Sequence, residues 1–163
     1  MSDPIRFETG SAMLLGGLRR HHAFQHADFG GQWREFDAFG PLPGQLGEYA
    51  YGVICGASAT ACEYMCAVEV SALEVLPTGL GRMRITPQHY AVFLHQGHVS
   101  TLPRTWQAAL DWLARSSWES AHKPDFERYG AGFDPTTGSG EVEIWLAIVR
   151  QDYERKLREG RDH

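Results

Sequence analysis

Residues 87–113 of the 163-residue chain read PQHYAVFLHQGHVSTLPRTWQAALDWL, and their periodicity changes along the stretch. Residues 90–95 form a short apolar run, which predicts a strand. From residue 101 on, apolar side chains recur at helical spacing: Leu102, Trp106, Ala109, Leu110 and Leu113. This stripe predicts an amphipathic helix over residues 101–115. The stretch therefore predicts a strand followed by a helix that covers one face of a sheet.

Two further strands are expected after this helix. Residues 126–133 and 141–149 have strand character, and the turn sequence DPTTGSG separates them. The segment SSWESAHKP between the helix and the first of these strands is predicted to be a connection. Residues 90–149 therefore form one strand–helix–strand–strand unit.

The same order of elements is predicted in the first part of the chain. Residues 12–18 predict a strand, and four aromatic residues then follow at helical spacing: Phe29, Trp33, Phe36 and Phe39. Strands are predicted next over residues 49–55 and 62–70. Residues 12–70 and 90–149 are thus two copies of a βαββ unit, joined by LPTGLGRMRITP.

These patterns predict one α+β domain over residues 1–163, with a charged tail at residues 150–163 that is either a short helix or frayed. Each copy supplies one helix to cover a sheet face. Two such units side by side leave a cleft between the copies, and clefts of this kind are common sites for small ligands.

Composition narrows the class of protein. The formal net charge of -5 argues against a general nucleic-acid surface, which needs clustered Lys and Arg. We find no apolar run long enough to span a membrane and no signal peptide, so we expect a cytoplasmic protein. The three cysteines, Cys55, Cys62 and Cys66, lack CxxC spacing and are expected to be reduced, partly buried thiols.

Residues 123–135, KPDFERYGAGFDP, contain a carboxylate in an unexpected position. Alternation along a strand places Glu127 on one face with Tyr129, Ala131 and Phe133. Burial there would raise the pKa of Glu127 unless a partner holds its charge. That partner is either a cationic ligand within an aromatic cage, or an arginine such as Arg84 or Arg104; a surface position near a strand end is the third alternative.

Two groups of histidines are candidate sites. His21, His22 and His26, with Asp28, suggest either metal ligands or a polar loop between a strand and a helix, and we expect no metal there. His95 and His98 lie where a strand turns into a helix and are expected to be structural or exposed. The sequence has no G-x-S-x-G elbow and no phosphate-binding loop, so no cofactor is expected.

The segments 87–113 and 123–149, together with GPLPGQLGEYAYGVI and EYMCAVEV, resemble the gyrase-inhibitor-like (GyrI-like) effector-binding domain. This domain also forms the ligand-sensing half of bacterial AraC-type and MerR-type regulators. The resemblance covers about residues 12–149. It implies two SH2-like βαββ modules (SHS2 units) with pseudo-two-fold symmetry, whose antiparallel sheets surround a central ligand cleft.

The resemblance also implies site residues. The glutamate of the family's F-E-x-Y motif matches Glu127, and its tyrosine matches Tyr129. Tyr64 and Tyr90 match two further family tyrosines, and Phe133 follows on the Glu127 face. Trp145 either lines the cleft or is a core residue. One departure is Ala147, which stands where the family often has proline.

A stand-alone protein that senses or sequesters a lipophilic, cationic or aromatic small molecule, as a multidrug-binding module does, is the first functional hypothesis. The alternative is a hydrolase that opens cyclopropane-type genotoxic natural products with Glu127 and Tyr64 as catalytic groups. A third is a protein-interaction module, although no residues single out a partner. No helix-turn-helix is seen, so direct DNA binding by this chain is not expected.

Overall fold

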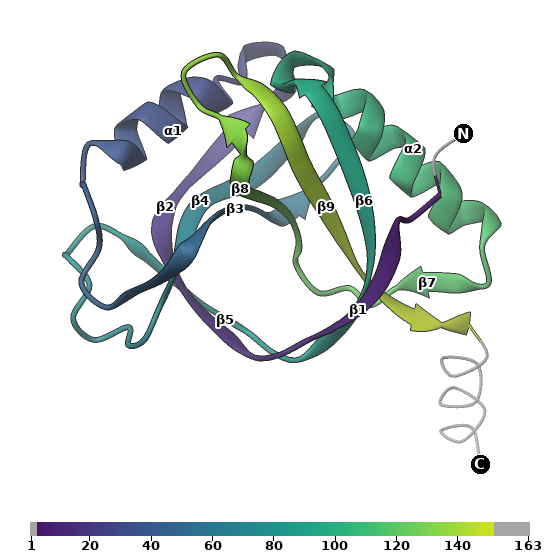
Figure 1. The fold of residues 1–163 in the computed structure, drawn as a ribbon, viewed down its shortest axis with the longest axis horizontal. Helices are drawn as coiled ribbons and strands as arrows, with labels where there is room; N and C mark the ends of the chain where they lie inside the picture. Colours follow the sequence, from purple (N-terminus) through teal and green to yellow (C-terminus); the bar gives the residue numbers. More distant parts are fainter. Residues whose placement is uncertain (1–2, 152–163) are drawn as a thin grey trace.

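The computed structural model describes residues 3–151, which form nine strands and two α-helices. All nine strands belong to one antiparallel sheet that curls into a half-barrel, with α1 and α2 on its outer side (Figure 1). None of the helices in the described part of the chain is both long and apolar enough to cross a membrane.

Both predicted βαββ units are present. The first comprises β2 (Met13–Ala23), α1 (Phe29–Asp37), β3 (Gln45–Ala57) and β4 (Ala61–Val70). The second comprises β6 (Gln88–His98), α2 (Leu102–Arg115), β8 (Asp125–Asp134) and β9 (Ser139–Arg150). The duplication predicted from periodicity is therefore confirmed. Of the predicted tail, Arg150 ends β9, and residues 152–163 lie outside the described residues.

Three short strands complete the sheet: β1 (Arg6–Gly10), β5 (Gly81–Ile85) and β7 (Trp118–Ser120). Part of the predicted connection SSWESAHKP is thus a strand, because β7 pairs with the end of β9. The polar residues after position 18 also continue β2 to Ala23, because they pair with residues 61–65 of β4. A 3₁₀ turn, Phe24–His26, then leads to α1, and another, Val99–Thr101, leads to α2.

The strand order is symmetric. It runs β1-β6-β9-β8-β3-β4-β2-β5, so the two units meet at the central pair β8 and β3. At the edges, β1 precedes the first unit in sequence but pairs with β6 of the second, and β5 precedes the second unit but pairs with β2 of the first. Each unit therefore receives its edge strand from the segment before the other, which ties the two copies into one sheet.

The apolar core is divided by the sheet. One cluster lies beneath α1 and includes Leu18, Phe36, Leu42, Cys66 and Leu73. A second lies beneath α2 and includes Phe93, Leu102, Ala109, Ile144 and Leu146. A third fills the inside of the half-barrel and includes Leu15, Tyr51, Val53, Tyr90, Phe126 and Trp145. Both faces of the central strands are therefore covered by side chains.

Buried polar groups attach α1 to the sheet. The Nδ1 atom of His22 accepts from the Asp28 backbone N–H, so its Nε2 carries the proton and donates to Gln32 Oε1 at 2.5 Å. The Gln32 side-chain nitrogen donates to the carbonyl oxygens of Leu18 and Tyr64 at 2.8 and 2.9 Å. Because both ring nitrogens of His22 are used in this way, His22 is a structural residue.

The cysteines agree with the sequence-based expectation. Cys55, Cys62 and Cys66 are all free thiols, and the last two are buried. Burial raises the pKa of the Cys66 thiol, which keeps it protonated and unreactive.

Close packing of β2 on β4 makes Gly17 sensitive to substitution. A Cβ at Gly17 would collide with the backbone carbonyl oxygen of Cys66, whereas a Cβ at Gly56 would meet no atom within 4 Å. We expect Gly17→Ala to lower the free energy of unfolding by about 2–4 kcal/mol and Gly56→Ala to change it by less than about 0.5 kcal/mol. Urea denaturation of the two variants measures this, and equal effects would contradict the packing described.

Candidate functional site

Four elements converge on one buried carboxylate. Glu127 lies in β8 on the outer face of the sheet, and only 6% of its surface is exposed. Its hydrogen-bond partners come from β4, α2 and β8 itself, and Trp33 of α1 contacts two of them. The site therefore lies at the junction of both helices and both βαββ units.

Neutral groups supply the hydrogen bonds of this carboxylate. The hydroxyl groups of Tyr64 and Tyr129 both donate to Glu127 Oε1 at 2.7 Å, and Trp106 Nε1 donates to Oε2 at 2.7 Å. The alternative of an ion pair with Arg84 or Arg104 is not realised, since no ion pair of Glu127 occurs within residues 3–151. Glu127 is thus hydrogen-bonded by neutral groups and forms no ion pair within these residues, although the nearby His95 favours its ionised form.

A glycine on the neighbouring strand makes this arrangement fit. Gly52 of β3 lies directly opposite Glu127 in the sheet register. A Cβ at Gly52 would collide with the Tyr64 hydroxyl and come within 2.7 Å of Glu127 Oε1. The missing side chain is therefore what allows Tyr64, from the next strand, to reach the carboxylate.

The electrostatics of the site follow from burial. Burial raises the pKa of Glu127, and the hydrogen bonds from Tyr64, Trp106 and Tyr129 offset only part of this effect. Burial and the nearby carboxylate also raise the pKa values of Tyr64 and Tyr129 well above the ordinary range for tyrosine. Both phenols therefore remain protonated and keep donating to Glu127.

Aromatic side chains cover the carboxylate. The ring centre of Tyr129 lies 5.4 Å from that of Trp33 and 4.9 Å from that of Phe133. Trp33, Trp106, Tyr129 and Phe133 are each only partly buried. They form the layer between Glu127 and solvent, which makes them the residues that a ligand would meet first.

Sequence reasoning missed Trp33 and Trp106 as site residues. Both fall on the apolar stripes of their helices, where a tryptophan is ordinarily a core residue. The available signal was their indole N–H, which needs a partner when buried. Sequence alone does not reveal which acceptor the topology brings near.

The structure separates the six residues predicted to contact ligand. Glu127, Tyr64, Tyr129 and Phe133 lie together on the outer face. Tyr90 and Trp145 lie on the inner face of the half-barrel, where the Tyr90 ring contacts that of Trp145 at 5.3 Å. The inner-face residue Phe126 stacks on Trp145 at 5.4 Å and lies next to Glu127 in the chain. The six predicted residues therefore lie on two opposite faces of the sheet.

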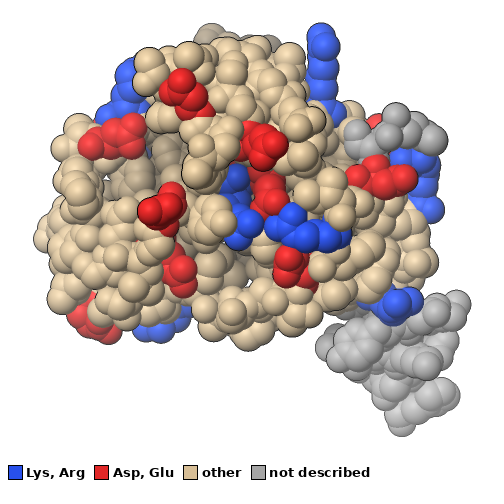
Figure 2. All heavy atoms as spheres, viewed as in Figure 1, with Lys and Arg blue, Asp and Glu red and all other residues tan. Residues whose placement is uncertain are grey.

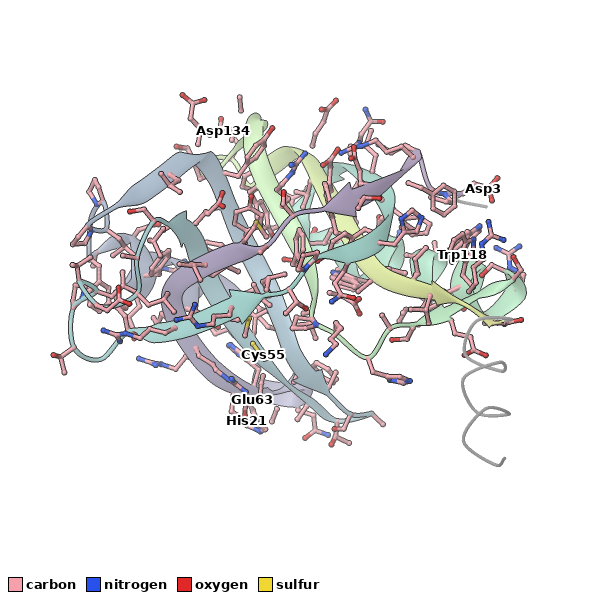
Figure 3. All side chains as sticks on the ribbon, turned by 90° about the horizontal axis from the view of Figure 1, so that it is seen from below. Asp3, His21, Cys55, Glu63, Trp118 and Asp134 are labelled. Atoms are coloured by element: carbon pink, nitrogen blue, oxygen red, sulfur yellow. The ribbon has the colours of Figure 1, made fainter. Side chains whose placement is uncertain are left out.

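The other polar candidates have structural roles. His95 is buried and bonds to Thr105 Oγ1 at 2.7 Å and to the His98 carbonyl oxygen at 3.0 Å, which joins the end of β6 to the start of α2. His21 pairs with Glu63, and Figure 3 shows the two together, far from Asp134 at the end of β8. No group of three potential metal ligands occurs within the described residues.

Comparisons with known proteins agree on the fold. The model of the GyrI-like small molecule binding domain matches residues 3–149, and no curated protein matches the chain. The structure of SAV2435 bound to tetraphenylphosphonium has a TM-score of 0.71 and 18% identity, over 88% of this chain and 93% of that one.

Two other structures are similar to this chain. The integron cassette protein VCH_CASS2 of Vibrio cholerae has a TM-score of 0.65 and 14% identity, over 91% of this chain and 97% of its own. EcmrR in its complex with DNA has a TM-score of 0.71 and 11% identity, over 89% of this chain and 57% of EcmrR. At such identities these structures show a shared fold.

The raised pKa of Glu127 has a consequence for stability. A carboxyl whose pKa is raised by folding stabilises the protein below its unfolded pKa, and this contribution is lost as pH rises through the folded pKa. Glu127→Gln keeps the shape without the charge. We expect it to be more stable than the wild type at pH 8, by about 1–2 kcal/mol.

The stability advantage of Glu127→Gln over the wild type should shrink steadily towards pH 4, where the wild-type carboxyl is also neutral. Urea denaturation of both proteins across this range measures the difference. A stability difference that does not vary with pH would contradict the assignment of a desolvated carboxylate.

Proposed function

The chain belongs to the GyrI-like small molecule binding domain family, and we propose that its ligand is an aromatic, lipophilic cation held by Glu127. One observation carries the proposal. Glu127 is buried, and its hydrogen-bond donors are the neutral groups of Tyr64, Tyr129 and Trp106. A buried carboxylate without a cationic partner in the described part of the chain is complementary to a ligand that brings the charge itself.

Binding requires the aromatic cover to move. A ligand reaches Glu127 by displacing the rings of Trp33 and Trp106, which then pack against its aromatic groups. Rings placed around a desolvated cation each add about 0.5–2 kcal/mol of cation–π attraction. The phenol hydroxyls of Tyr64 and Tyr129 continue to donate to the carboxylate, so the ligand's charge adds to this hydrogen bonding.

The role that we propose is sensing or sequestration of such molecules in the cytoplasm. The similar structure of SAV2435 holds tetraphenylphosphonium, a lipophilic aromatic cation, which supports this class of ligand. The part of EcmrR that this chain matches belongs to a protein bound to DNA, which supports a link to regulation. The free thiols of Cys55, Cys62 and Cys66 fit a reducing compartment.

Hydrolysis is a second candidate function, favoured by one feature of the same site. Burial raises the pKa of Glu127, which suits a carboxyl that exchanges a proton with a substrate or water, and the Tyr64 hydroxyl lies 2.7 Å from it. In this function Glu127 takes a proton from the attacking water, and the Tyr64 hydroxyl polarises the carbonyl group attached to the ring. Water adds to a ring carbon, the strained carbon–carbon bond breaks, and the carbonyl-bearing fragment takes up the electron pair and a proton.

Tetraphenylphosphonium tests the binding proposal. We expect saturable binding by isothermal titration calorimetry, weakened at least about tenfold in Glu127→Gln, because a buried charge pair loses one partner. Glu141→Gln is the matched control, since it removes an exposed carboxylate from β9 and should leave the affinity unchanged.

The affinity of the wild type should also fall as pH decreases through the folded pKa of Glu127, and this dependence should be absent in Glu127→Gln. If Glu127→Gln and Glu141→Gln bind the cation equally well, the carboxylate does not hold the ligand.

Mass spectrometry distinguishes the two functions. With a cyclopropane-containing alkylating agent as substrate, hydrolysis predicts a ring-opened product with the added mass of water. It should be formed by the wild type and reduced at least about a hundredfold in both Glu127→Ala and Tyr64→Phe, provided circular dichroism shows both variants folded. Equal product yield from the wild type and both variants would remove the hydrolytic role.

A further inference from the structure

A pocket lies on the opposite side of the sheet from Glu127. Its volume is about 240 Å³, and it opens inside the half-barrel beside the link between β1 and β2. The floor is aromatic and consists of Tyr51, Tyr90, Phe126 and Trp145. Drug-sized ligands occupy pockets of roughly 300–1,000 Å³. The size therefore suits a smaller molecule with one aromatic ring.

One wall of this pocket carries a fixed guanidinium group. Arg128 follows Glu127 in β8 and points to the inner face, where its guanidinium carbon lies 4.1 Å from the ring centre of Tyr49 and 4.8 Å from that of Trp145. Arg128 donates to Glu143 Oε1 at 2.7 Å, and Arg6 binds the same carboxylate at 2.7 and 3.0 Å. These contacts hold the guanidinium in place.

The network also determines the charge of Glu143. Burial opposes ionisation, but the hydrogen bonds from Arg6 and Trp145 and the charge of Arg128 together lower the pKa of Glu143. Glu143 is therefore an anion shared between two arginines. A guanidinium has five N–H donors, so Arg128 retains donors for a ligand carboxylate.

The opposite wall carries a carboxylate. Glu69 of β4 lines the pocket and is partly exposed. Tyr51 of β3 lies directly opposite Arg128 in β8 and opposite Ala67 in β4, two residues before Glu69. Side chains two apart share a face, so Arg128 and Glu69 lie on either side of Tyr51. In Figure 2, basic and acidic side chains alternate near the middle of the visible face.

We propose that this inner pocket binds a small aromatic zwitterion, an aromatic amino acid or a close chemical relative. Arg128 takes the carboxylate, Glu69 takes the ammonium group, and the aromatic floor takes the ring. Arginine matches a planar carboxylate through two parallel hydrogen bonds. The site is separate from the Glu127 site, because residues 127 and 128 point to opposite faces of the sheet.

Three probes that differ only in charged groups test this proposal: L-phenylalanine, 3-phenylpropionate without the ammonium group, and phenethylamine without the carboxylate. Isothermal titration calorimetry should give saturable binding of phenylalanine with a Kd at or below about 1 mM. Each charge-deleted probe should bind at least about tenfold more weakly, because one charged wall is left without a partner.

Variants locate the binding. Arg128→Gln and Glu69→Gln should each weaken phenylalanine binding at least about tenfold. In Arg128→Gln, Glu143 still accepts two hydrogen bonds from Arg6, so this variant is expected to fold. Ala12→Trp fills the exposed rim of the pocket without altering charge and should abolish binding, whereas Ala59→Trp, in the distant β3–β4 turn, should not.

Three results would overturn the proposal: no saturation by phenylalanine up to about 10 mM, equal binding of all three probes, or unchanged binding in Ala12→Trp. Loss of phenylalanine binding in Glu127→Gln, with binding retained in Arg128→Gln, would place the amino acid at the outer site and overturn it too. Failure here leaves the tetraphenylphosphonium experiment unaffected, since that experiment concerns the outer face.

Discussion

The carboxylate of Glu127 is the constraint around which this fold is organised. Its burial is unfavourable unless its oxygens are hydrogen-bonded, and Tyr64, Tyr129 and Trp106 meet that need with neutral groups. Gly52 leaves the space through which Tyr64 reaches it. The arrangement stabilises the charge chiefly by hydrogen bonds from neutral groups, with a smaller contribution from His95, and therefore favours an incoming cation.

The duplication places this group at the centre of the molecule. The two βαββ units meet at β3 and β8 (Figure 1). One face of these strands is therefore turned towards both helices, and the other face is turned towards the inside of the half-barrel. Strand alternation then gives adjacent residues opposite surroundings. Glu127 faces the helices and Arg128 faces the interior, so each face carries its own charged groups.

Periodicity predicted both helices and the six strands of the repeated units, because each has an apolar pattern of its own. It did not predict β1, β5 or β7, whose short segments become strands only by pairing with β6, β2 and β9. Alternation placed Glu127, Tyr129 and Phe133 on one face. It could not relate them to Tyr90 and Trp145, because the face that a strand presents depends on sheet register. Phe126 lies opposite Trp145 in that register, so Trp145 faces inward.

The protonation of Glu127 tests the central claim most directly. Carbon-13 NMR of the side-chain carboxyl, titrated with and without tetraphenylphosphonium, reports its pKa in both states. The account predicts a pKa above the ordinary range for glutamate in the free protein and a lower one when the cation is bound, because a nearby positive charge favours the ionised form. An ordinary pKa in the free protein, or one that the cation leaves unchanged, would contradict it.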